Sequence, residues 1–137
     1  MFRHSIILFL TFFPIFLKSQ NIDFYLTLLE KGQINEVRNN LPELFERYPE
    51  NAGVYFLDAL TTDNGDTSVL KYETIIEKYP DTKFASLSLM RIGEYLFARG
   101  LYSQASSRFK NLLIKYPDGD HHQRAMDLMV DSYFATG

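Results

Sequence analysis

The sequence predicts an all-α protein, an α-α superhelix of about three helical hairpins followed by one unpaired helix. Two sequence signals that typically end helices recur along it. The pair Tyr-Pro appears three times, and glycines 33, 35 and 37 residues apart lie between the pairs, at Gly32, Gly65, Gly100 and Gly137. A repeat of this length is typical of stacked supersecondary units. Apolar residues between these points recur at the period of an α-helix.

Each repeat is predicted to be a helical hairpin. A Tyr-Pro pair follows each of the first three glycines by 14 to 16 residues, at Pro49, Pro80 and Pro117. That length fits one helix of three to four turns. Proline ends a helix because it disfavours the helical conformation of the residue before it, and glycine adopts the left-handed conformation just past a helix end. We therefore expect repeats over 20–49, 50–80 and 81–117, and an incomplete one over 118–137.

The first two repeats keep part of this pattern. Residues 20–49 have Gly32 and Pro49 at matching offsets, without a glycine inside the first helix. Residues 50–80 are two residues short after Gly65. Their second helix is predicted over 68–79, with Leu70, Ile75 and Ile76 buried.

The third repeat has the clearest pattern. Its first helix places apolar residues at spacings of 4, 3 and 4, and Gly93 lies inside it. A glycine there costs about 1 kcal/mol relative to alanine, so we expect it to permit close packing of two helices, opposite the small Ala105. The second helix then presents a stripe of Tyr102, Ala105, Phe109, Leu112 and Tyr116.

The residues of this repeat carry a resemblance to a known family. The order and spacing of six of them resembles one tetratricopeptide (TPR) repeat: Gly93, Gly100, Tyr102, Ala105, Phe109 and Pro117. The Tyr79-Pro80-Asp81 joint and the long loops resemble exported TPR proteins of the Tol-Pal system (YbgF/CpoB type) and the BamD-like outer-membrane assembly family. BamD-like proteins are lipoproteins, whereas this chain has no cysteine to carry the lipid. The resemblance implies the periplasm or cell envelope of a Gram-negative-type bacterium.

The N-terminus resembles an export signal. Arg3 and His4 precede a stretch of 13 residues, Ser5 to Leu17, that is almost wholly apolar, and a polar Lys18-Ser19-Gln20 follows. A basic start, an apolar stretch of this length and a polar exit are typical of a signal peptide, and the stretch is shorter than the about 20 residues of a spanning helix. We expect residues 1–19 to be removed, leaving a TPR-like domain over 20–137; the alternative is an uncleaved anchor.

Composition narrows the class of function. The 137 residues have a net charge of −3 and no cysteine. These values disfavour a general nucleic-acid binder, which is normally basic, and they exclude disulfides and thiolate metal sites. Charge is divided along the chain, with −7 over residues 20–82 and +5 over 83–117. We interpret these charges as belonging to solvated helix faces. The alternatives are that they steer an acidic partner or favour head-to-tail contact.

No pattern in the sequence predicts catalysis or a cofactor. Serines lie on the repeat helices without a nucleophile turn, and no phosphate-binding glycine loop is present. One loop gathers groups that are able to bind a divalent metal, namely Asp118, Asp120, His121 and His122. Adjacent histidines point apart, so we interpret this loop as solvated. The prediction is a non-enzymatic protein without a cofactor or a metal.

The predicted binding surface is the inner face of the repeats. The first helix of each pair lines this face in a solenoid, and methionine beside aromatic residues suits a peptide groove. The candidate partner-binding residues are Tyr55, Phe56, Ala59, Leu87, Met90, Arg91, Glu94, Phe97, Asp127 and Asp131. We expect an envelope protein or peptide as partner, with the membrane reached through export or through such complexes.

The alternative function is a spacer or an oligomerisation platform for a further C-terminal domain. Residues 118–137 are predicted to form a first helix whose partner helix is missing, so we expect the 137 residues to be a fragment. Met126, Met129, Val130, Tyr133 and Phe134 would then stay partly exposed. By resemblance, the further domain would bind peptidoglycan (SPOR type) or take part in outer-membrane assembly.

Overall fold

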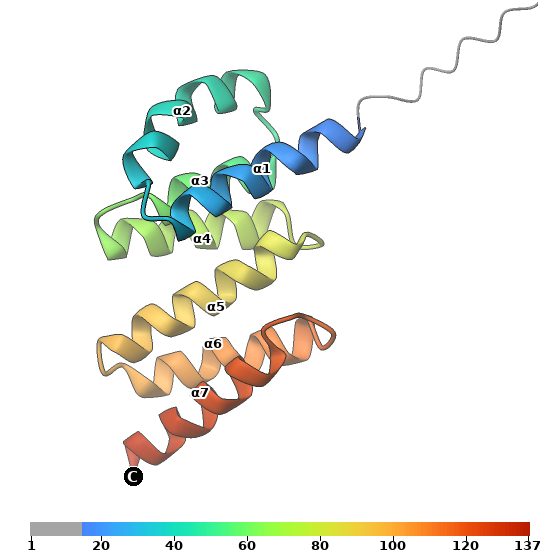
Figure 1. Cartoon of the computed structure of the whole chain (residues 1–137). Helices are drawn as coiled ribbons and strands as arrows, with labels where there is room; N and C mark the ends of the chain where they lie inside the picture. The colour runs from blue at the N-terminus through green and yellow to red at the C-terminus, as the bar shows by residue number, and fades with distance from the viewer. Residues whose placement is uncertain (1–14) are drawn as a thin grey trace, which may run out of the picture.

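Seven α-helices make up the part of the chain that the computed structural model describes, residues 15–137 (Figure 1). Side chains are described from residue 22 onward. No strand occurs within these residues, which confirms the all-α prediction. The helices are α1 (Ile15–Glu30), α2 (Ile34–Arg47), α3 (Ala52–Leu60), α4 (Gly65–Lys78), α5 (Lys83–Ala98), α6 (Tyr102–Lys115) and α7 (His122–Thr136).

The predicted signal peptide, residues 1–19, lies for the most part outside the described residues. Helix α1 begins at Ile15, inside that segment, so removal of residues 1–19 would take away its first turn. Within residues 15–137, the helices are too short or too polar to cross a membrane.

The helices are stacked in chain order, from α1 and α2 at one end to α7 at the other (Figure 1). Each helix contacts the next, and α1, α3, α5 and α7 also contact one another in sequence. In contrast, α2, α4 and α6 make no contact with one another. The odd-numbered helices therefore form an inner layer and the even-numbered helices an outer layer.

Two of the predicted glycine turns have the expected conformation. Gly32 and Gly100 have φ of +77° and +75°, the left-handed region that favours glycine. The amide of Gly100 donates to the carbonyl of Phe97, and that of Leu101 to the carbonyl of Leu96, both at 2.9 Å. These paired bonds satisfy the last carbonyls of α5 and close the hairpin with α6.

The third predicted glycine turn is wrong in its details. Gly65 has no left-handed φ and is the first residue of α4. The turn before it ends at Asn64, whose side-chain Oδ1 accepts a hydrogen bond from the amide of Thr67 at 2.8 Å. An asparagine N-cap therefore starts this helix. Gly65 is needed for a different reason, because a Cβ atom there would overlap the ring of Tyr95.

Gly93 permits close packing, but the partner differs from the predicted one. A Cβ atom at Gly93 would lie 2.5 Å from Cε1 of Phe109. The side chain of Phe109 is fully buried, so α5 and α6 approach each other where a whole phenylalanine ring fills the space left by the glycine. The prediction that Ala105 sits opposite Gly93 underestimated how large the facing side chain could be.

The predicted core of α4 needs one correction. Leu70 is 68% exposed, whereas Tyr72 and Ile75 are buried. Tyr72 packs against Phe56 of α3, with ring centroids 5.7 Å apart. The register of α4 turns Tyr72 and Ile75 toward α3, so Leu70 lies on the outer surface.

The Tyr-Pro joints are linked to one another. The hydroxyl of Tyr79 donates to the Glu50 carboxylate at 3.1 Å, and that of Tyr116 donates to the carbonyl of Pro80 at 2.6 Å. Each tyrosine thus reaches back to the region of the preceding joint. Burial, with Glu50 adding to it, raises the pKa of Tyr79 to about 12. Burial also raises the pKa of Tyr116, with a smaller effect of Asp81.

The two oppositely charged segments of the chain are joined by ion pairs. Lys83, Arg99 and Arg108 of the basic segment pair with Asp23, Asp66 and Glu73 of the acidic segment, at 3.4, 3.0 and 2.7 Å. Three of the six basic residues in 83–117 therefore meet carboxylates of the acidic segment. These ion pairs link the third repeat to both the first and the second.

Candidate binding groove

A groove runs along the inner layer of helices and crosses the middle of α5. It consists of two adjoining clefts of about 450 and 320 Å³, and both are lined by Leu87, Arg91 and His121. We call this feature the inner groove. Its larger cleft adds Leu26, Leu29, Glu30, Ile34, Phe56 and Leu60, and its smaller cleft adds Met90, Glu94 and Arg124.

Apolar side chains dominate the larger cleft of the inner groove. Leu26 and Leu29 come from α1, Leu60 from the end of α3, and Leu87 from α5. All four are only partly buried. A ligand that covers them would remove apolar surface from water, which is the main favourable contribution to association.

Charged groups are concentrated in the smaller cleft. Nη1 of Arg91 lies 3.2 Å from Oε2 of Glu94, one turn away on α5. Arg124 of α7 reaches Oε1 of the same carboxylate from both Nε and Nη2, each at 2.8 Å. Glu94 thereby joins α5 to α7 and holds both guanidinium groups at one end of the groove.

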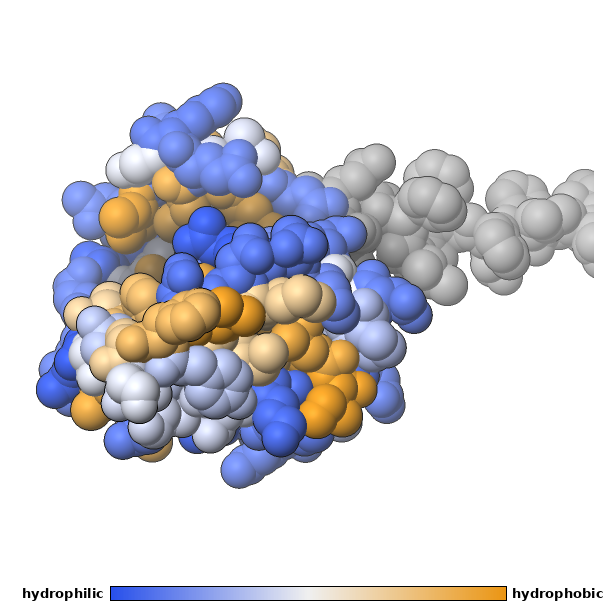
Figure 2. Space-filling model, turned by 90° about the horizontal axis from the view of Figure 1, so that it is seen from below, coloured by the Kyte–Doolittle hydropathy of each residue, from blue (hydrophilic) through white to orange (hydrophobic). Residues whose placement is uncertain are grey.

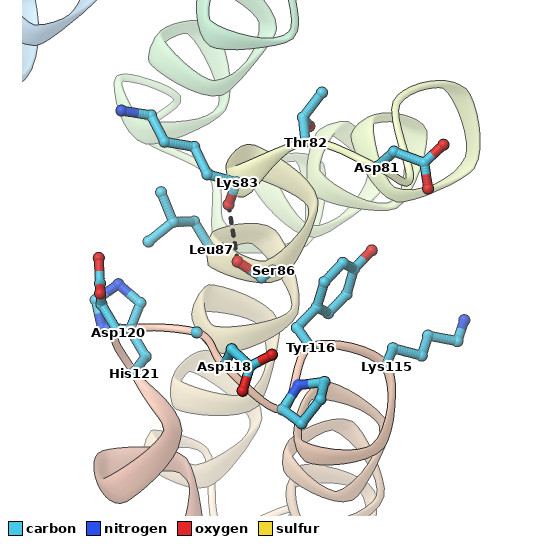
Figure 3. Close-up of a pocket in the computed structure, with 12 residues that line it drawn as sticks. Asp81, Thr82, Lys83, Ser86, Leu87, Lys115, Tyr116, Asp118, Asp120 and His121 are labelled. Atoms are coloured by element: carbon cyan, nitrogen blue, oxygen red, sulfur yellow. Dashed lines mark hydrogen bonds between the residues drawn. The ribbon is translucent and has the colours of Figure 1, made fainter.

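A third cleft, of about 550 Å³, opens from the same place toward the connection between α6 and α7. Figure 3 shows Ser86 and Leu87 of α5 across from Asp118 and His121 of that connection. Leu87 and His121 line this cleft as well as the inner groove. The Ser86 hydroxyl donates to the carbonyl of Lys83 at 2.9 Å, so this hydroxyl is engaged with its own helix.

Five of the predicted partner-binding residues line the inner groove, Phe56 and Met90 among them, and the other three are not buried. Leu87, Arg91 and Glu94 line it together. The two acidic candidates on α7 do not. Asp127 and Asp131 are exposed on α7, and Asp127 accepts a hydrogen bond from Gln123 at 2.9 Å.

Two of the predicted partner-binding residues belong to the core. Ala59 is fully buried, and Met90 is 3% exposed. Met90 packs in one cluster with Phe109 and Ala125, because α7 covers this side of α5. Ala59 packs beside Ile92 in a neighbouring cluster. Their predicted exposure is therefore wrong, because packing between successive repeats covers them.

The aromatic candidates are also mainly packing residues. Phe56 is 2% exposed and contributes only to the floor of the larger cleft. Phe97 packs edge-on against Tyr102 at 5.2 Å, within the third hairpin. Tyr55 lies between Phe45 and Tyr79, at 5.2 and 5.6 Å. These rings stabilise contacts between helices.

The structure adds residues to the groove that the periodicity did not identify. Leu26, Leu29 and Leu60 come from repeats with weaker patterns, His121 comes from the connection before α7, and Arg124 comes from the first turn of α7. The prediction aligned α7 with α5 at a fixed offset, which selected Asp127. The connection over 117–121 instead brings His121 and Arg124 beside Leu87, a result that helical period alone does not encode.

A second surface lies at the α7 end of the stack. Four large apolar residues of α7 are exposed there, from 39% to 82%: Met126, Val130, Tyr133 and Phe134. We call this the α7 stripe. Figure 2, which views the molecule from below, shows apolar residues gathered on this end and bordered by hydrophilic ones. The exposure that the sequence predicts for these four residues is thus present in the structure, and Met129 is half-buried.

The acidic and imidazole groups of the connection before α7 form no metal site in the described structure. Within residues 22–137, no three His, Asp or Glu side chains are close enough together to hold an ion. Asp118 and Asp120 are exposed, and His121 turns toward the groove. Nδ1 of His122 is buried without a hydrogen-bond partner.

Comparison with known proteins does not extend these observations. No family model matches the chain, and no curated protein or solved structure is significantly similar to it.

Proposed function

We propose that this chain is a non-enzymatic interaction module of the TPR type, which binds a partner peptide or protein in the inner groove. The observation that carries the proposal is the continuity of that groove across α1, α3 and α5, with partly exposed leucines along it. Concave, mostly apolar surfaces with a few polar groups are the usual binding sites of proteins. The order of the helices and the spacing of glycine and proline in 81–117 support the TPR type.

A peptide selection tests this function directly. Random dodecapeptides displayed on phage are selected on the 137-residue chain, and the affinities of enriched peptides are then measured by fluorescence anisotropy. Leu87→Gln should weaken their binding about tenfold, because Leu87 lines both clefts of the inner groove. Leu70→Gln is the matched control on the outer surface, since Leu70 is 68% exposed on α4. Equal affinities of the two variants, or no enrichment, would contradict the proposal.

We place this module in the cell envelope of a Gram-negative-type bacterium. The support is the N-terminal sequence, in which a basic start precedes a short apolar stretch and a small Ser19. Expression of the full chain in a Gram-negative host, followed by fractionation and intact mass measurement, tests the location. The expected product is periplasmic and starts near Gln20. A cytoplasmic product that retains residues 1–19 would contradict it.

Self-association is a second candidate function, favoured by the α7 stripe. Contiguous exposed apolar surface of this kind marks interaction sites, and a second copy of the chain offers the same surface. Sedimentation velocity over a range of concentrations tests this. A dimer is expected, and Val130→Glu with Phe134→Glu should dissociate it. A chain that stays monomeric at all concentrations would contradict an oligomerisation platform.

A further inference from the structure

The smaller cleft of the inner groove carries more positive charge than its one carboxylate, Glu94, neutralises. Arg91 and Arg124 both contact Glu94, so one carboxylate is shared between two guanidinium groups. An arginine guanidinium stays charged at all ordinary pH values. One positive charge therefore remains in excess at this end of the groove.

Both arginines are accessible to a ligand. Their side chains are 50% and 66% exposed, whereas that of Glu94 is 21% exposed. A guanidinium has five N–H donors, and the bond to Glu94 engages Nη1 of Arg91. Further donors of Arg91 are therefore available while Glu94 keeps the side chain in place. A preorganised arginine of this kind suits a second carboxylate, which it binds through charge-assisted hydrogen bonds.

The position of Arg91 indicates where in a ligand that carboxylate lies. Arg91 lines both clefts of the inner groove, with the leucines of α1 and α3 on one side and Arg124 on the other. A segment that lies along the groove would meet Arg91 partway along its length. An acidic side chain within the segment fits this place better than a chain end does. Glu30 also lines the groove, but it comes from α1, at the opposite side from Arg124.

We infer that the inner groove selects a peptide segment in which an aspartate or glutamate is flanked by apolar residues. The acidic side chain binds Arg91 and Arg124, and the apolar side chains cover Leu26, Leu29 and Leu60. This inference rests on the proposed function and specifies the class of its partner. The apolar floor distinguishes such a peptide from a nucleic acid, whose phosphates would meet Glu30 and the leucines as well.

The peptides enriched in the selection described above test this specificity. We expect them to be rich in Asp or Glu beside Leu, Ile, Phe or Met. Changing the acidic residue of a peptide to its amide should weaken binding to the native chain about tenfold. The same change should have little effect on binding to the double variant Arg91→Gln, Arg124→Gln. Arg47→Gln is the control, because Arg47 is exposed on α2 and pairs with Glu43.

The outcomes separate the two proposals. Peptides that depend on Leu87 but show no preference for an acid would overturn the inference and leave the proposed function standing. Peptides that do not depend on Leu87 would overturn the proposed function itself. Ion pairs of exposed arginines contribute little to stability, so the arginine variants should fold, which circular dichroism verifies.

Discussion

The hairpins α3–α4 and α5–α6 each pair two successive helices, but they are built in different ways. In α5–α6 the first helix has 16 residues and ends at Gly100, whose φ is +75°. In α3–α4 the first helix has 9 residues, and the second helix starts from the side chain of Asn64. One hairpin uses a backbone conformation that glycine permits, and the other uses a side-chain hydrogen bond. A repeat can therefore keep two paired helices without the glycine turn that identifies it in the sequence.

The glycines inside the two hairpins also differ in purpose. Gly93 makes room for Phe109 within its own hairpin, whereas Gly65 makes room for Tyr95 of the next hairpin. Tyr95 donates to Asp66 at 2.8 Å, beside the ion pair of Arg99 with the same carboxylate. The start of α4 is thus adapted to the contact between repeats. This difference explains why the second repeat departs from the pattern of the third.

The largest effect is expected from Phe109→Ala in the third hairpin. Phe109 is fully buried against Gly93, and truncation of a buried phenylalanine lowers the free energy of unfolding by about 3–5 kcal/mol. Urea denaturation followed by circular dichroism measures the change. Leu70→Ala on the exposed face of α4 is the control and should change stability by less than about 0.5 kcal/mol. Similar losses for both variants would show that α5–α6 is not packed as described.

Gly93→Val should have the next largest effect. The added side chain would overlap the ring of Phe109, and overpacking of a core costs about 1–3 kcal/mol. A smaller side chain at position 109 should relieve part of this cost. Phe109→Leu combined with Gly93→Val should therefore lower the stability by less than the sum of the two single changes. Thermal unfolding of the four chains gives the coupling free energy. Strict additivity would indicate that the two residues do not meet.

The two turns can be compared through Gly100→Ala and Asn64→Ala. Gly100→Ala forces alanine into the left-handed region, which costs about 1–2 kcal/mol. Asn64→Ala removes the N-cap of α4, at a typical cost of about 1 kcal/mol. Urea denaturation compares the two losses, and a loss only at Gly100 would show that the cap on α4 contributes nothing.

The smallest effect concerns the Tyr-Pro joints at high pH. The pKa of Tyr79 is raised to about 12 in the folded chain, from an ordinary 10.0. The folded state then holds this proton more tightly, so the resulting stabilisation is complete below pH 10 and is lost between pH 10 and about 12. The advantage of the native chain over Tyr79→Phe should therefore shrink across this range. Chemical denaturation at several pH values measures it, and a constant difference would exclude the linkage.

Much of the fold could be predicted from sequence because its signals are local. Gly100, Pro117 and the apolar stripe of 83–98 each act through the backbone or through neighbours one turn away. Helices α5 and α6 lie within the repeat predicted over 81–117, and α7 lies within the one predicted over 118–137. Leu70 was assigned to the core wrongly, because its apolar character does not reveal which face of α4 meets α3. The register of a single helix depends on its partners.

The sequence predicted only part of the inner groove, because its signals are local to single helices. Leu87, Arg91 and Glu94 follow from the inner face of α5, where the repeat pattern is strongest. Met90 could not be separated from them, because its burial depends on α7, which is 32 or more residues away in the chain. Leu26, Leu29 and Arg124 were missed because they enter the groove from other helices.

The sequence by itself determined the all-α class, the alternation of helices and turns, and the helix that presents the groove. These features depend on helical period, proline and glycine, whose effects extend over a few residues. Only the tertiary structure decided which side chains stay accessible, which glycine faces Phe109 or Tyr95, and how Glu94 comes to hold both Arg91 and Arg124. Those outcomes depend on how successive helices pack, because exposure and charge pairing are properties of several segments at once.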